Sequence, residues 1–355
     1  MESISYTDNQ PTSAKRIFSL DVAKFICALL VIIIHTRPFS QLSGIIDFYV
    51  ADVIVRIAVP LFFAISGHLF FRGLRYQDGK LSNCAENRTQ FFRYLRRIVG
   101  IYVGWSIVYA LFQLPQWYQS GWWGKQLIKD YAASFLLSGS YFHLWYLLAL
   151  IYALPCLYLL LTVVSVRKLR MMLPVLWLVE CLLYSYSWIG IDSIPALTWL
   201  TGHFSIIFDA VFRAIPLLGV GILCIEGQEK PSQKLSFCAV FSVLICAIEA
   251  SILHFCTANS GKYSYILFTP VMTYFLLRLL LRSTKSGPSW VGTLCRKSSL
   301  AIYCLHPLIL GILKLMGVES AMLLWILVTL ITVFLALFWV VAKTRTQEKK
   351  ASAQK

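Results

Sequence analysis

Ten apolar runs, each close to 20 residues long, constrain this 355-residue chain more than any other feature of its sequence. A helix needs about 20 consecutive apolar residues to cross the hydrocarbon core of a bilayer. Composition agrees, since 58% of the residues are hydrophobic and only 14% are charged, against about 25% charged in a soluble domain. We therefore expect an all-α, polytopic integral membrane protein. The predicted spans are 18–38, 48–71, 98–115, 141–164, 171–189, 203–224, 235–256, 263–281, 299–316 and 320–342.

Basic residues concentrate in alternate connections between these spans. Seven lie between residues 72 and 97, whereas the 116–140 connection has two. Under the positive-inside rule this bias places both termini in the cytoplasm and the protein in the cell (cytoplasmic) membrane. The net charge of +16 therefore sets orientation, and nucleic acid is not expected as a partner. The 116–140 connection, rich in Trp and Tyr, is expected to hold a short helix at the outer interface.

The same pattern divides the chain into three predicted segments. These are a cytoplasmic N-terminal segment (1–17), a transmembrane domain (18–342) and a basic cytoplasmic tail (343–355). The ten cysteines are scattered, without a CxxC pair or other metal-ligand spacing, so we expect them to pack in the spans and expect no metal site.

A polar stripe follows the first predicted span. At about 100° per residue, the eleven steps from Lys24 to His35 return to nearly the same helical face, and Asp21 lies one turn before Lys24. Ionisable groups at membrane depth cost roughly 2.5 kcal/mol or more, and such residues are usually functional. We therefore expect Asp21, Lys24 and His35 to belong to the site.

Further charged residues lie deep in later spans. Arg56 either bonds carbonyls exposed by a proline kink or contacts an anionic ligand, and we favour the ligand. Asp209 and Arg213, four residues apart, can pair on one helix face, as a structural ion pair or as part of the site. Glu180 and Glu249, lone acids of the fifth and seventh spans, are left out of the site.

Two histidines lie in other spans. His143 precedes Trp145 and Tyr146 at the outer start of the fourth span, where interfacial anchoring explains the two aromatic residues but not the histidine. His306, directly before a proline, is either a packed histidine at a kink or a residue that faces the ligand. Lys314 lies near a span end, from which its side chain can reach the interface.

These residues resemble the acyltransferase family 3 membrane proteins, which O-acetylate cell-envelope carbohydrates. The family usually has Arg, ten residues and then His, whereas Lys24 takes the arginine position here and lacks its planar fork. Lysine also stands there in members that resemble the membrane domain of the vancomycin-resistance serine transporter/racemase. The resemblance covers nearly the whole chain, through Leu20-Asp21-Val-Ala-Lys24, His35-Thr36, Arg56 to Ser66-Gly67, His143-Leu-Trp145-Tyr146 and Ile302-Tyr303-Cys-Leu-His306-Pro307.

The resemblance implies an integral-membrane O-acyltransferase. It would take the acetyl group from cytoplasmic acetyl-CoA, as co-substrate, to a hydroxyl of a cell-envelope glycan or lipid-linked saccharide. Lys24, held by Asp21, would attract the CoA phosphates, and Arg56 would stabilise the oxyanion. His35 either deprotonates the acceptor or carries the acetyl group itself. The substrate-binding set is then Ser66, His143, Trp145, Tyr146, Asp209, Arg213 and His306.

A transporter of a small amino acid such as serine is the alternative function, favoured by Lys24 and by the second resemblance. The polar residues would line a path that opens alternately to each side. We expect no soluble racemase domain, because the chain ends shortly after its last predicted span. A structural or sensing membrane protein would leave the polar stripe unexplained.

Overall fold

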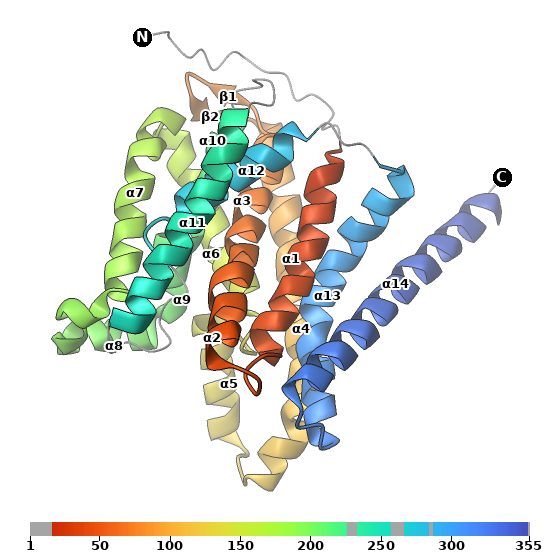
Figure 1. Ribbon diagram of the computed structural model, residues 1–355. Helices are drawn as coiled ribbons and strands as arrows, with labels where there is room; N and C mark the ends of the chain where they lie inside the picture. Colours follow the sequence, from red (N-terminus) through yellow and green to blue (C-terminus); the bar gives the residue numbers. More distant parts are fainter. Residues whose placement is uncertain (1–15, 226–232, 257–265, 284–286, 354–355) are drawn as a thin grey trace. The chain divides into compact units, whose positions relative to one another are not determined.

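The computed structural model describes residues 16–225, 233–256, 266–283 and 287–353, which are almost entirely helical (Figure 1). One short antiparallel hairpin pairs Tyr76 with Leu81 and Gln77 with Lys80. Two of the segments marked η, η1 and η5, are π-helical, and the other three are 3₁₀ turns. The elements are α1 (Phe18–Thr36), α2 (Gly44–Asp47), η1 (Phe48–Ile54), η2 (Val55–Ile57), α3 (Ala58–Phe71), β1 (Tyr76–Gln77), β2 (Lys80–Leu81), α4 (Ala85–Gln119), α5 (Lys125–Leu137), α6 (Trp145–Val163), α7 (Val166–Leu183), η3 (Ser187–Ile189), η4 (Ile191–Ser193), α8 (Pro195–His203), α9 (Ser205–Phe208), η5 (Asp209–Ala214), α10 (Ile215–Leu223), α11 (Gln233–Cys256), α12 (Thr269–Arg282), α13 (Ser289–Leu315) and α14 (Ala321–Ala353).

Eight helical stretches among the described residues are long and apolar enough to cross a membrane. At about 1.5 Å per residue, the 19 residues of α1 span about 28 Å, close to the ~30 Å of a bilayer core. The all-α prediction is confirmed. The stretches are Phe18–Thr36, Gly44–Phe71, Ala85–Gln119, Trp145–Val163, Ser205–Leu223, Gln233–Cys256, Ser289–Leu315 and Ala321–Lys343.

The other two predicted spans, 171–189 and 263–281, also contain helices, but of a different character. α7 carries three basic residues in its first turns and Glu180 near its end. α12 has only 14 residues, about 21 Å of helix, and residues 263–265 lie outside the described residues. Ten membrane crossings therefore remain a prediction.

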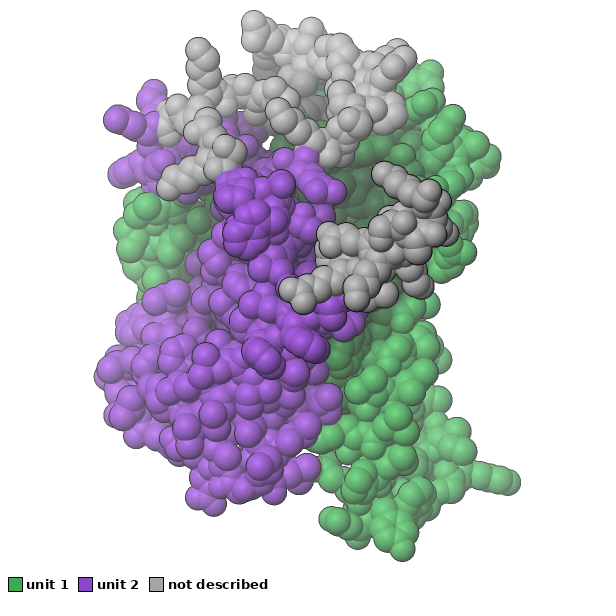
Figure 2. Space-filling model, turned by 90° about the vertical axis from the view of Figure 1, so that its right-hand side faces the viewer, with its two compact units in different colours: residues 1–15, 63–229, 238–277 green, residues 16–62, 230–237, 278–355 purple. Residues whose placement is uncertain are grey.

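The described residues form two compact units, coloured separately in Figure 2. α3, α11 and α12 contribute residues to both. Unit 1 contains the described residues of 63–229 and 238–277, and unit 2 contains those of 16–62, 230–237 and 278–355.

In unit 2, α1 packs along α13, and α14 packs against α13. α1 and α13 run in the same direction and α14 returns antiparallel, so the start of α1 and the end of α14 lie at one end of the unit (Figure 1). Gly287 and Gly292 allow this close packing, because a Cβ on Gly287 would overlap the Phe18 ring and one on Gly292 would lie 3.2 Å from it. A larger residue at Gly287 would push α1 away from the segment that leads into α13.

In unit 1, α10 approaches α3 at backbone distance in two places. A Cβ on Gly221 would overlap the Ala64 carbonyl oxygen, and one on Gly67 would overlap the Leu218 carbonyl oxygen. Small residues at helix interfaces are typical of membrane proteins, where close backbone packing drives association. The segment 116–140 holds α5, which confirms the predicted short helix, while its place at the membrane interface stays a prediction.

Candidate functional site

His35 lies at the very end of α1. The helix stops after Thr36 because Arg37 adopts a left-handed conformation (φ 47°), and its N–H bonds the Ile33 carbonyl. The Thr36 hydroxyl donates to the Ile32 carbonyl at 2.8 Å, which caps the last turn and holds this end of the helix. The half-buried His35 ring is thereby placed in the last turn of the helix.

His35 stacks on His306 of α13, with ring centroids 5.4 Å apart and an interplanar angle of 25°. His306 is fully buried, and its Nδ1 lies 3.1 Å from the Ile302 carbonyl oxygen. Because a carbonyl only accepts, Nδ1 carries the proton in this bond, which fixes the tautomer of the ring. The structure thus brings together two histidines that lie 271 positions apart in the sequence.

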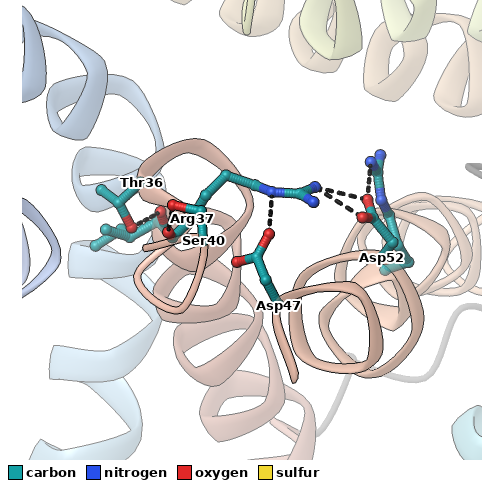
Figure 3. Close-up of polar contacts among 7 residues, drawn as sticks. Thr36, Arg37, Ser40, Asp47 and Asp52 are labelled. Carbon is teal, nitrogen blue, oxygen red and sulfur yellow. Dashed lines mark hydrogen bonds and ion pairs between the residues drawn. The ribbon is translucent and has the colours of Figure 1, made fainter. Parts of the chain in front are cut away.

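An ionic network begins at Arg37, the residue that ends α1 (Figure 3). The Arg37 guanidinium lies between two carboxylates, with Nε 2.7 Å from Asp47 and Nη1 2.8 Å from Asp52. Arg56 binds the same Asp52 through Nη2 at 2.8 Å. The charge of Arg56 acts on the His35 ring. Asp52 therefore holds an arginine that lies within electrostatic range of the histidine.

Asp47 and Asp52 were not among the predicted site residues. Asp47 is 3% exposed and contacts Arg37, whereas Asp52 joins Arg37 to Arg56. The spacing of four between Asp52 and Arg56 is the same signal that pointed to Asp209 and Arg213, and it was available from the sequence. The contact between Asp47 and Arg37 could not be recognised from the sequence.

Asp21 and Lys24 lie toward the opposite end of α1. Eleven residues at about 1.5 Å each place Lys24 about 16 Å from His35 along the helix axis. Asp21 is buried near Gly292 of α13, where a Cβ would lie 3.7 Å from the carboxylate, and Lys24 is half-buried. The structure therefore separates these two residues from His35 along α1.

A second charged cluster lies in unit 1 around Arg213, which is 7% exposed. Its Nε and Nη2 contact Oε1 of Glu180 at 2.7 and 2.5 Å, and its Nη1 contacts Asp209 at 2.8 Å. The guanidinium carbon lies 5.3 Å from the Trp145 ring and 5.1 Å from the Tyr184 ring. The predicted Asp209–Arg213 pair is present.

Glu180 is the residue that sequence reasoning missed here. It is fully buried and makes the contacts to Arg213 from α7, which lies 33 positions earlier in the chain. Nothing in its local sequence shows this contact, because tertiary packing brings α7 to η5. Setting Glu180 aside left out a member of the predicted Asp209–Arg213 cluster.

The remaining predicted site residues of unit 1 pack among aromatic side chains. His143 is 1% exposed, with its ring 4.9 Å from Tyr109 and edge-on to it. Tyr146 packs against Phe63 at 4.5 Å and shares a hydrogen bond of 3.2 Å with the Ser66 hydroxyl. The structure places Ser66 and Tyr146 in contact, and nothing in the geometry tests their role.

Two other ionisable residues have simpler surroundings. Glu249 accepts hydrogen bonds from the Tyr186 hydroxyl at 2.5 Å and from the backbone N–H groups of Leu267 and Phe268 at 2.6 and 3.2 Å. It therefore holds the start of the α12 segment. Lys314 is exposed in the last turn of α13.

Across the described ranges, no group of three or more His, Cys, Asp or Glu side chains is placed to hold a metal ion.

The fold defines a helical domain with several membrane-spanning candidates and charged residues within them. Residues 17–344 match the family model of the acyltransferase family 3 domain, whose description is "Acyltransferase domain". Because this match covers most of the chain, the chain belongs to that family and is a multi-pass membrane protein.

Three curated relatives are similar to most or part of the chain. The serine/alanine racemase of Enterococcus gallinarum is 29% identical over 298 residues, which cover 81% of this chain and 40% of the racemase. Two amino-acid racemases of Enterococcus faecalis are 28% identical over 307 residues (82% and 41%) and 27% identical over 191 residues (54% and 24%). The chain spans about two fifths of the length of the first two. No solved structure matches.

Proposed function

We propose that this protein is a cytoplasmic-membrane O-acyltransferase that moves an acetyl group from acyl-CoA to a hydroxyl of a cell-envelope glycan or lipid-linked sugar. The observation that supports it most is the half-buried His35, stacked on His306 and within electrostatic range of an arginine that Asp52 binds. Acyl transfer to a hydroxyl requires a base and a cation that act on the same reacting group. Membership of an acyltransferase family agrees with this chemistry.

The proposed reaction needs one proton acceptor and one oxyanion partner. Neutral His35 takes the proton of the acceptor hydroxyl while the hydroxyl oxygen attacks the thioester carbonyl. Arg56 stabilises the negative charge that develops on the carbonyl oxygen. As the tetrahedral intermediate collapses, the carbon–sulfur bond breaks, and the proton passes from His35 to the leaving thiolate. His306, whose tautomer is fixed by Ile302, holds the His35 ring in place by stacking.

The donor would bind toward the start of α1. Asp21 and Lys24 lie at the end of unit 2 where α1 begins and α14 ends (Figure 1), which the charge bias assigns to the cytoplasm. We propose that Lys24 and the exposed basic residues of the 72–97 segment attract the CoA phosphates. The proposed acceptor-binding residues are Ser66, His143, Trp145, Tyr146, Asp209 and Arg213.

The test is thiol release from acetyl-CoA by the purified protein, with envelope lipid extract as acceptor. We expect His35→Ala to lower the rate by about 10²–10⁴, the usual contribution of a general base. His203→Ala is the matched control, because His203 is an exposed histidine that contacts Trp199 of its own helix. Full thiol release by His35→Ala in the presence of acceptor would remove His35 from the catalytic role.

A second candidate function is transport of a small amino acid such as serine. It is favoured by the relatives, which are named serine/alanine and amino-acid racemases and share the region that this chain covers. Lysine at position 24 agrees with that resemblance. Reconstituted vesicles that accumulate labelled serine, while the protein releases no thiol from acetyl-CoA, would establish transport instead.

A further inference from the structure

Two oxygen atoms of α7 and its C-cap are buried in unit 1 with no hydrogen-bond partner in the part of the chain that the structure describes. They are Oε2 of Glu180 and the hydroxyl of Tyr184. Glu180 is fully buried, and only its Oε1 binds Arg213. Since buried polar atoms are nearly always satisfied, two orphan oxygens on residues four positions apart indicate a group that donates hydrogen bonds to them.

The charge of the cluster indicates the sign of that group. Arg213 is contacted by two carboxylates, Glu180 and Asp209, so the ionised cluster carries one surplus negative charge. A buried charge needs a counter-charge. The rings of Trp145 and Tyr184 already hold the guanidinium by cation–π contacts at 5.3 and 5.1 Å, so the walls of the cluster are attractive to a cation.

A primary ammonium group fits these surroundings better than a metal ion. It brings three hydrogen-bond donors, whereas the hard metal cations take six or more oxygen ligands. We propose that the cluster of Glu180, Asp209, Arg213 and Tyr184 binds the ammonium group of an amine-bearing ligand, through the free oxygen of Glu180 and the Tyr184 hydroxyl. The side chain of Asp209 is 13% exposed, so the ligand enters at this edge.

The inference deepens the proposed function and rests on it for the nature of the ligand. The acceptor of acyl transfer, or the solute in the transport alternative, is then a molecule that carries a free amine beside its hydroxyl. An amino sugar and a hydroxy amino acid share this chemistry. Binding of the amine is distinct from the chemistry at His35, so it is measured without any acyl donor.

The test compares matched ligands by thermal unfolding of the full-length protein in detergent micelles. D-Glucosamine is paired with N-acetyl-D-glucosamine and L-serine with L-glycerate, so that only the charged amine differs at one position. We expect one amine of the two pairs to raise the unfolding temperature in a saturable manner, as a ligand of the native state does, and its partner without the ammonium group to leave it unchanged. Glu180→Gln should weaken amine binding at least tenfold.

Glu86→Gln is the matched control, because it removes an exposed acid of the same unit whose nearest basic contact is 3.7 Å away. Amine binding in this variant should equal that of the unchanged protein. If Glu180→Gln does not fold, Tyr184→Phe deletes only the orphan hydroxyl, retains the ring beside Arg213, and should weaken binding at least threefold.

Absence of any amine-specific shift, or unchanged amine affinity in Glu180→Gln or in Tyr184→Phe, would overturn the inference. Because these binding measurements are made without an acyl donor, their result does not depend on whether the protein transfers acyl groups. Thiol release that depends on His35, together with no amine binding, leaves the acyltransferase proposal standing and removes the ammonium site. Amine binding without thiol release supports the ammonium site and removes the acyltransferase proposal.

Discussion

Replacing Asp52 by asparagine tests the proposed arrangement around His35. The Asp52 carboxylate, 13% exposed, binds Arg37 and Arg56, which are 39% and 29% exposed. Breaking a fully buried ion pair costs about 3–5 kcal/mol, and an exposed pair is worth about 0.2–1 kcal/mol. Since Asp52 lies between these limits, we expect Asp52→Asn to lower the free energy of unfolding by about 2 kcal/mol, which a stable domain survives.

The same substitution is expected to slow the reaction. Arg56 stays in Asp52→Asn, but it loses the carboxylate that binds it. Removing one well-placed oxyanion donor costs about 10²–10³ in rate, so loosening one should lower kcat about 10–100-fold. That is about 1.4–2.7 kcal/mol of transition-state stabilisation.

Asp47→Asn is the matched control, because Asp47 contacts Arg37 and makes no ion pair with Arg56. Thiol release and thermal unfolding are measured for both variants, and we expect similar losses of stability but a loss of rate only in Asp52→Asn. Adding Arg56→Lys to Asp52→Asn should lower the rate little further, since both changes act through one guanidinium. Equal rates in the two aspartate variants, or fully additive losses in the double variant, would refute the reasoning.

Three further outcomes are expected. His306→Phe, which keeps a ring against His35 but loses the fixed Nδ1–H, should lower kcat about tenfold at nearly unchanged unfolding temperature, and an unchanged kcat would make His306 a packing residue only. Gly221→Ala should lower the free energy of unfolding by about 1–3 kcal/mol or more, because its methyl group meets the Ala64 carbonyl. Gly104 has open space around it, so Gly104→Ala should raise the free energy of unfolding by about 0.5–1 kcal/mol. If thermal unfolding shows Gly221→Ala to be more stable than Gly104→Ala, the packing described for α10 is wrong.

Local patterns in the sequence were enough for the helices and for individual polar residues. Hydropathy located helices at all ten predicted spans, and eight helical stretches among the described residues have the length and composition of a membrane crossing. His35 and His306 were each recognised as unusual polar residues in apolar helices. Their stacking depends on how α1 packs along α13, which no local pattern contains.

The partners of the charged residues were harder to predict for the same physical reason. Arg213 could be paired with Asp209, four residues before it, because both lie in one helix. Glu180 reaches Arg213 from another helix, so it was judged a lone acid and set aside. Asp47 reaches Arg37 across the turn after α1, and the sequence offers no spacing rule for such a contact. Ion pairs within a helix are thus predictable, whereas those between helices need the packing.

Both charged clusters include residues of a helix that departs from α geometry. η1 holds Asp52 and η5 holds Asp209 and Arg213, and both are π-helical segments inside membrane-spanning stretches. A π segment bonds five residues apart and therefore turns every later side chain away from the face that a period of 3.6 assigns to it. Helical periodicity applied through either segment consequently gives the wrong direction for the residues beyond it. Because of this rotation, one continuous span can direct Arg56 or Arg213 toward its partners while its apolar residues still pack. Individual site residues were therefore easier to predict from the sequence than the directions in which their side chains point.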